Sequence, residues 1–168
     1  MATAVGLFVD LSNLFFCAVK KFGPKKKVDY ERLLDYVRED HGQVYRAVAY
    51  GTQSNGEARE FITALRKIGY DTKYKQPDVL PDKSLDRFNW SVGICLDVVR
   101  MIGRLDAVVI ASANPNLVPL VEWVKEQGVR VIVLACGISK KLKEVADQYV
   151  EIESDLLEGR EDEDAGDA

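Results

Sequence analysis

The sequence predicts an α/β fold with a doubly wound, mostly parallel sheet and helices on both faces. Continuous apolar segments at Ala4–Val9, Leu105–Ala111 and Val129–Ala135 are typical of strands buried on both faces. Segments with helical periodicity lie between the predicted strands, and glycine ends most of them. At 168 residues the chain is long enough for one domain with a sizeable core.

The predicted strands differ in how apolar they are. The first ends in an acid, the third alternates and looks more exposed, and the last is short enough for a sheet edge. In chain order they are Ala4–Asp10, Gln43–Tyr50, Tyr70–Lys75, Leu105–Ala111, Val129–Ala135 and Gln148–Ile152.

The helices have start and stop signals. Asp29 is a candidate N-cap, Ser139 caps the last helix, and glycine follows four of the others. In chain order they are Leu11–Phe22, Tyr30–Glu39, Gly56–Ile68, Asn89–Ile102, Leu117–Gln127 and a short helix from Ser139 to Ala146.

Charge is distributed unevenly along the chain. Residues 151–168 hold nine acids and one base, a net of −8, whereas the remaining 150 residues carry 22 bases and 18 acids. We therefore expect a domain over residues 1–152 and an acidic tail over 153–168, disordered from about residue 159. The tail either aids solubility or competes with nucleic acid for the basic surface of the body.

Cysteine and histidine content limits the chemistry. Cys17, Cys95 and Cys136 are scattered, without a CxxC spacing, which favours reduced thiols inside a cytoplasmic protein. The single histidine, His41, precedes a glycine and is expected in a surface loop, so a Cys/His zinc site is excluded. No segment is apolar and long enough to span a membrane, and we expect none.

Chemistry in such a sheet is expected beyond the carboxyl ends of the strands. Asp10 ends the first strand there, with Asn13 close behind, and the segment Ser112–Asn116 follows the fourth strand. Asp10 is either a metal-binding carboxylate or the cap of the following helix. No glycine-rich phosphate loop is present, which disfavours a nucleotide-binding Rossmann protein.

Asp97 is the second acid of interest. It lies among apolar residues of a predicted helix. Gly93, one turn earlier, has no side chain and so leaves room for another group to approach this face of the helix. A buried carboxylate needs a partner, a metal or a functional reason.

Four segments together resemble the NYN domains, the LabA-like branch of the PIN-like nuclease superfamily. They occur in the family's order, between residues 5 and about 152, and are FVDLSNL (8–14), NWSVGICLD (89–97), SANPNLVPL (112–120) and LKEVAD (142–147). The resemblance implies a PIN-like fold and, in active members, RNA cleavage with Mg or Mn held by carboxylates. Position by position, Asp10 and Asp97 match family acids, Asn13 its Asn and Ser112 its Ser.

The departures from the family pattern concern the acids. Ser91, Asn114 and Asn116 stand where the family has aspartates, so three of five carboxylates are replaced. An amide oxygen can ligate a hard cation but brings no charge to hold it. We therefore expect a divergent site whose metal, if any, binds Asp10 and Asp97. Asp82 or Asp86, in the loop before the helix, is a candidate recruited acid.

Three functions remain open at this stage. The chain is an RNA-binding or regulatory protein with weak or lost cleavage, an active Mg/Mn ribonuclease that uses Asp10, Asp97 and a recruited acid, or a protein-interaction module. Lys140 and Lys141, next to the active edge, favour RNA as the partner, while a protein partner or a homo-oligomer stays open. Five aromatic residues are candidates for stacking on bases, namely Tyr45, Tyr50, Tyr74, Phe88 and Trp90.

Overall fold

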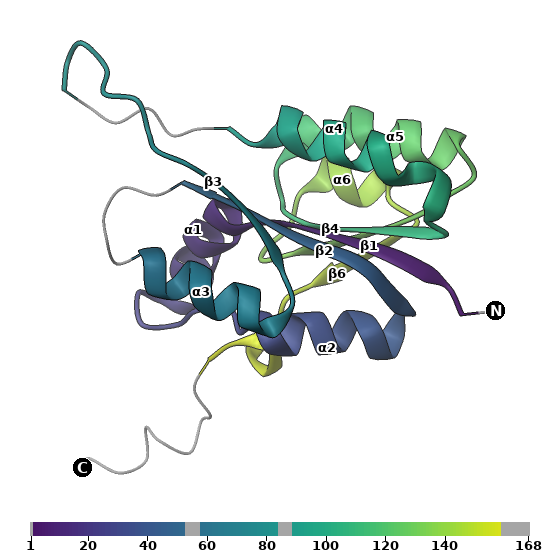
Figure 1. Cartoon of the computed structure of the whole chain (residues 1–168), viewed down its shortest axis with the longest axis horizontal. Helices are drawn as coiled ribbons and strands as arrows, with labels where there is room; N and C mark the ends of the chain where they lie inside the picture. The colour runs from purple at the N-terminus through teal and green to yellow at the C-terminus, as the bar shows by residue number, and fades with distance from the viewer. Residues whose placement is uncertain (1, 53–57, 84–88, 159–168) are drawn as a thin grey trace.

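Six parallel strands form one sheet in the order β3-β2-β1-β4-β5-β6 (Figure 1). The computed structural model describes residues 2–52, 58–83 and 89–158. The strands are β1 (Ala4–Asp10), β2 (Gln43–Thr52), β3 (Asp71–Lys75), β4 (Ala107–Ala111), β5 (Arg130–Ala135) and β6 (Gln148–Glu151). The α/β class predicted from the sequence is confirmed.

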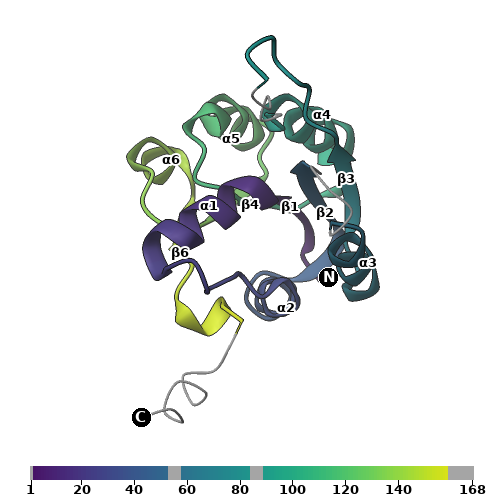
Figure 2. The ribbon, with the colours of Figure 1, turned by 90° about the vertical axis from the view of Figure 1, so that its left-hand side faces the viewer.

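Three helices cover each face of the sheet (Figure 2). On one face lie α1 (Leu11–Phe22), α2 (Tyr30–Asp40) and α3 (Ala58–Ile68). On the other lie α4 (Ser91–Met101), α5 (Val118–Glu126) and α6 (Lys140–Val145). The central strands are buried on both sides, which explains why they are continuously apolar.

Local signals explain where the first two helices begin. The Asp10 carboxylate accepts a hydrogen bond from the Asn13 backbone N–H, and Asp29 does the same for the N–H groups of Glu31 and Arg32. Each aspartate therefore caps its helix, because it accepts hydrogen bonds from first-turn backbone N–H groups that have no partner within the helix. Both helices start at the residue predicted from these caps.

Several helix ends differ from the prediction by one or two residues. The Asn89 side chain accepts a hydrogen bond from the Ser91 N–H, so α4 begins at Ser91, and a 3-10 turn over Ile102–Arg104 follows it. A second 3-10 turn, Pro115–Leu117, delays α5 by one residue. Ser139 precedes α6 but makes no side-chain capping bond.

The chain after β6 packs against the start of α2. Leu156 and Leu157 are buried, and Leu157 pairs with Val28 in an isolated antiparallel bridge. The Asp29 N–H donates to the Leu156 carbonyl at 2.8 Å, and the Glu158 N–H to the Lys27 carbonyl at 2.8 Å. The packed chain thus continues past Ile152 to Glu158. The segment expected to be disordered, from about residue 159, lies outside the described residues.

The cysteines and the histidine occupy different environments. Cys136 is buried and Cys17 and Cys95 are partly buried, all as free thiols. His41 is half-buried instead of lying in an open loop, because its ring packs edge-on against Tyr36 at 5.6 Å between centroids. In the part of the chain that the structure describes, no helix has the length and apolar character to cross a bilayer.

Candidate functional site

The carboxyl ends of β1 and β4 bring five predicted site residues together. Asp10 ends β1, and Ser112 follows β4, its neighbour in the sheet. The Ser112 hydroxyl donates to Asp10 Oδ2 at 3.3 Å, while Asp10 Oδ1 accepts the Asn13 N–H at 3.2 Å. Asp10 therefore caps a helix and also belongs to a polar cluster at this edge.

Asn13 and Asn114 extend this cluster along the segment that follows β4. Asn13 Oδ1 accepts a hydrogen bond from the Ala113 N–H at 2.9 Å. The Asn114 N–H donates to Ser112 Oγ at 3.1 Å, and Asn114 Oδ1 accepts the Asn116 N–H at 3.0 Å. The Asn114–Ser112 and Asn116–Asn114 bonds are local serine- and Asx-type turns that fix the backbone leading into the Pro115–Leu117 turn, whereas the Ala113–Asn13 bond ties this segment to α1.

Ser91, the first residue of α4, joins the cluster from a third element. Its hydroxyl accepts a hydrogen bond from Asn114 Nδ2 at 3.0 Å. Asp10, Asn13, Ser91, Ser112 and Asn114 are thus connected through hydrogen bonds, and Asn116 is exposed at their border. We call these six residues the edge cluster.

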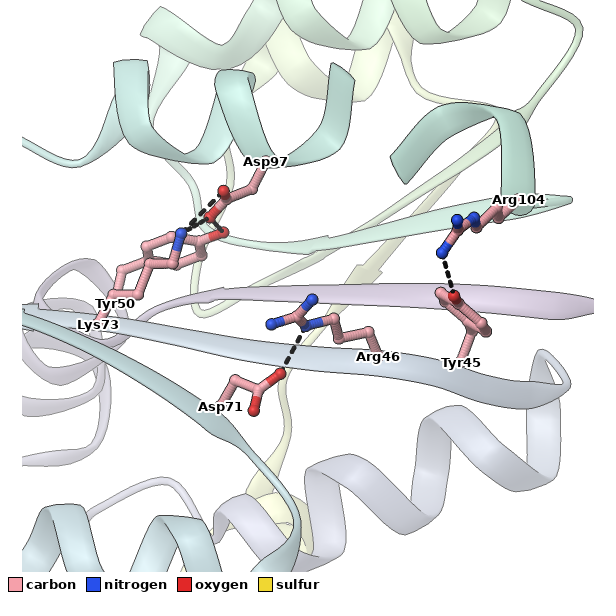
Figure 3. Close-up of polar contacts among 7 residues, drawn as sticks. All are labelled: Tyr45, Arg46, Tyr50, Asp71, Lys73, Asp97 and Arg104. Atoms are coloured by element: carbon pink, nitrogen blue, oxygen red, sulfur yellow. Dashed lines mark hydrogen bonds and ion pairs between the residues drawn. The ribbon is translucent and has the colours of Figure 1, made fainter. Parts of the chain in front are cut away.

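Asp97 belongs to a separate polar group on the inner side of α4 (Figure 3). The Tyr50 hydroxyl donates to Asp97 Oδ2 at 2.7 Å. Lys73 Nζ contacts both carboxylate oxygens, at 2.8 and 2.7 Å, and Arg100 lies 3.6 Å from Oδ1. The Asp97 side chain is 7% exposed, so its charge is balanced within the protein.

The room that Gly93 leaves is occupied by an aromatic ring. A Cβ atom at Gly93 would lie 2.8 Å from the Trp90 ring, so the ring requires glycine there. Trp90 is itself held by a hydrogen bond from its Nε1 to the Gly51 carbonyl at 2.9 Å. The expected space beside Gly93 is therefore filled by the protein's own Trp90 ring and not by an outside group.

Burial sets the ionisation of the central groups. Burial raises the pKa of the Asp10 carboxyl above its ordinary value, and the hydrogen bonds from Asn13 and Ser112 offset part of this shift. Burial, with the bond to Asp97, raises the pKa of Tyr50 above its ordinary value, so Tyr50 acts as a hydrogen-bond donor. Asp10 is therefore the one carboxylate of the edge cluster, in a partly desolvated position.

A family model matches most of the chain, namely the NYN domain over residues 4–153. The chain belongs to the NYN domain family. The chain is also similar in structure to a protein of unknown function from Vibrio parahaemolyticus RIMD 2210633, for which a crystal structure exists. That protein is 27% identical, with a TM-score of 0.81, and the match covers 93% of this chain and 96% of that one. No curated protein matches.

The donors that the described residues of this NYN domain supply do not fit the Mg or Mn that the resemblance implies. Among residues 2–52, 58–83 and 89–158, no three acids, cysteines or histidines are grouped so that they could hold a metal. Lys73 and Tyr50 occupy both oxygens of Asp97, and Asp10 faces neutral amides and hydroxyls. A hard divalent cation prefers several carboxylate oxygens, so this donor set lacks the necessary charge.

The lysines predicted beside the site are exposed. Lys140 and Lys141 open α6, which lies next to the Pro115–Leu117 turn. Of the aromatic candidates, Tyr50 and Trp90 are core residues, whereas Tyr45 is 49% exposed. Phe88 and Asp86 lie outside the described residues, and Asp82 is an exposed residue of the loop after β3.

Sequence reasoning missed Lys73. The alternation of residues 70–75 places it on one face of β3 with Asp71 and Lys75, but the local pattern does not reveal its partner. The signal that could have found it is the buried Asp97, which required a cation from another element.

Proposed function

We propose that this NYN domain binds single-stranded RNA at the carboxyl edge of its sheet, with weak or no cleavage. The observation that carries the proposal is the edge cluster, in which Ser91 and Asn114 are hydrogen-bonded to each other at positions where the resemblance expects acids. A cluster with one carboxylate repels phosphate less than one with four, which it would hold with acids at positions 91, 114 and 116, and amides and hydroxyls can bind phosphate or sugar oxygens directly.

Surface charge supports RNA as the partner. Lys140 and Lys141 are exposed on α6, beside the Pro115–Leu117 turn that carries Asn116. Lysines near a backbone-binding edge release counterions when they neutralise phosphates, which makes binding strongly salt-dependent. The finer assignment to the LabA-like branch is part of this proposal.

The test is incubation of a labelled single-stranded RNA with Mn or Mg, with EDTA and the Asp10→Asn variant in parallel. The expected result is intact RNA that is retained on the protein at low salt and released as salt rises. Metal-dependent cleavage that disappears with EDTA and in Asp10→Asn would instead establish an active ribonuclease. Absence of RNA retention at low salt would contradict the proposal.

The exposed face of α4 favours a second candidate, a protein-interaction module. Val92, Leu96 and Val99 are 70%, 50% and 47% exposed and recur at helical spacing on one stripe. A protein partner or a second copy would bury them. Sedimentation of the wild type and of Leu96→Glu tests the second copy: a dimer that dissociates in the variant supports it, and monomers in both contradict it.

A further inference from the structure

A strip of basic side chains crosses the sheet face below α4, away from the edge cluster. The parallel register pairs Val48 with Asp71, Tyr50 with Lys73 and Thr52 with Lys75. Paired residues of parallel strands project to the same face, and Val48 and Tyr50 pack in the core under α4. Asp71, Lys73 and Lys75 therefore project to the α4 side of β3, an edge strand.

Side chains from three elements complete the strip. Arg46 of β2 forms an ion pair with Asp71, and Arg100 reaches from α4 toward Asp97 (3.6 Å). Arg104, after α4, donates a hydrogen bond to the Tyr45 hydroxyl at 2.9 Å (Figure 3). We define the basic strip as these cations with the tyrosine, namely Tyr45, Arg46, Lys73, Lys75, Arg100 and Arg104.

The strip keeps a net positive charge after its internal pairs are counted. It holds five cations, and its carboxylate partners are Asp71 and Asp97. Its side chains remain accessible: Arg46 is 50% exposed, Lys73 41% and Arg100 70%. Each of these cations still has N–H donors that its internal partner leaves open, because a guanidinium has five and an ammonium three.

The strip also offers one stacking surface, the ring of Tyr45. The Tyr45 ring is half-exposed, with its hydroxyl fixed by Arg104, so its face can stack on a base. At the other end Lys75 Nζ lies 5.4 Å from the centre of the Trp90 ring, which is buried and therefore serves to position the lysine. From Tyr45 to Lys75 the strip follows β2 and β3 for roughly 20 Å.

We propose that the basic strip binds the phosphodiester backbone of single-stranded RNA along β2 and β3 and leads it toward the edge cluster. This inference rests on the proposed RNA-binding function and adds the path of the strand to it. Arg46, Lys73, Arg100 and Arg104 contact phosphates, and Tyr45 stacks on one base. A single-stranded ligand fits best, because its bases are free to stack and its backbone can follow an extended strand.

The test is fluorescence anisotropy of a labelled oligouridine of about 12 nucleotides at several salt concentrations. The variant Arg46→Gln/Arg104→Gln removes two exposed charges of the strip. The matched control, Arg59→Gln/Lys67→Gln, removes two exposed charges from α3 on the opposite face. A third variant, Lys140→Gln/Lys141→Gln, removes the charges beside the edge cluster.

The strip variant is expected to bind about tenfold more weakly, with a log–log salt slope about 1.4 shallower, since each lost phosphate contact on a single strand contributes about 0.7. The α3 control is expected to stay within about twofold of the wild type. Tyr45→Ser should lose affinity while Tyr45→Phe keeps most of it, because only the former removes the stacking ring.

The outcomes separate the strip from the function it rests on. RNA binding that is unchanged in the strip variant but weakened in Lys140→Gln/Lys141→Gln would overturn the strip and leave RNA binding at the edge intact. No binding by the wild type at low salt would overturn both. An oligoglutamate of equal charge that binds as tightly as the oligouridine would identify the strip as a site for acidic peptides and overturn the RNA assignment.

Discussion

The side-chain amide of Asn114 donates a hydrogen bond to the hydroxyl of Ser91 at 3.0 Å. The family resemblance expects an acid at both positions, and two carboxylates at this distance would repel each other unless a cation lay between them. The neutral pair needs no cation, because each group satisfies the other. The edge cluster is thus stable as a polar network without a metal.

Restoring the acids should create a metal site. The triple variant Ser91→Asp/Asn114→Asp/Asn116→Asp is expected to bind Mn at least about tenfold more tightly than the wild type, since it adds three charges beside Asp10. Calorimetric titration with Mn measures this. Gln148→Glu, a charge added at the far edge strand β6, serves as the control. Equal affinities in all three proteins would mean that the motifs are wrongly aligned with the family.

Asp10→Asn should stabilise the fold near neutral pH. Burial raises the pKa of Asp10, so the folded state binds a proton more readily than the unfolded state, and the free energy of unfolding falls as pH rises through that range. The asparagine of the variant does not ionise, so its free energy of unfolding does not fall in this way, and its Tm should exceed that of the wild type by about 2–4 °C at pH 7. Thermal unfolding across pH 3–8 should show the difference shrinking toward low pH; a less stable variant at pH 7 would contradict the prediction.

Lys73→Met should destabilise the fold by about 2 kcal/mol. Removing one partner of a fully buried ion pair destabilises a fold by about 3–5 kcal/mol. Here the partial exposure of Lys73 and the nearby Arg100, which remains, make the destabilisation smaller. Urea unfolding measures the change. Adding Asp97→Asn should recover part of it, because the second change removes the unpaired charge. Equal losses in the single and double variants would show that Lys73 does not neutralise Asp97.

His41 should make the fold less stable in mild acid. Burial lowers the pKa of His41, and its ring nitrogens have no hydrogen-bond partner. Below about pH 6.5 the unfolded state binds the proton first, so the free energy of unfolding decreases as pH falls toward the lowered pKa. Urea unfolding of the wild type and of His41→Gln should give a difference that changes in this window. A difference that is constant with pH would exclude the effect.

The edge cluster was predictable because it follows from topology. In a parallel sheet the carboxyl ends of neighbouring strands meet, so Asp10 and Ser112 had to lie close once β1 and β4 were recognised as strands. The start of α4 is the exception. The helix was expected to begin at Asn89, but the bond from the Ser91 N–H to the Asn89 side chain postpones its start by two residues.

The partner of Asp97 could not be read from the sequence in the same way. Burial implied that a cation was needed, but Lys73 lies 24 residues earlier on an edge strand. Its position depends on the register between β2 and β3, which fixes which alternate residue of β3 faces α4. Likewise Tyr50 was only a candidate for stacking on bases, and packing shows that it is buried with its hydroxyl on Asp97.

The sheet order has a consequence for how the chain folds. β1 is central and lies between β2 and β4, so its pairing with β4 joins Val5 to Ala107, about 100 residues apart. During synthesis the first three strands emerge with one side of β1 open, and that side stays unpaired until the second half leaves the ribosome. A high share of pairings between residues distant in sequence slows folding. The unpaired edge of β1 is therefore a site at which the nascent chain can aggregate before β4 is made.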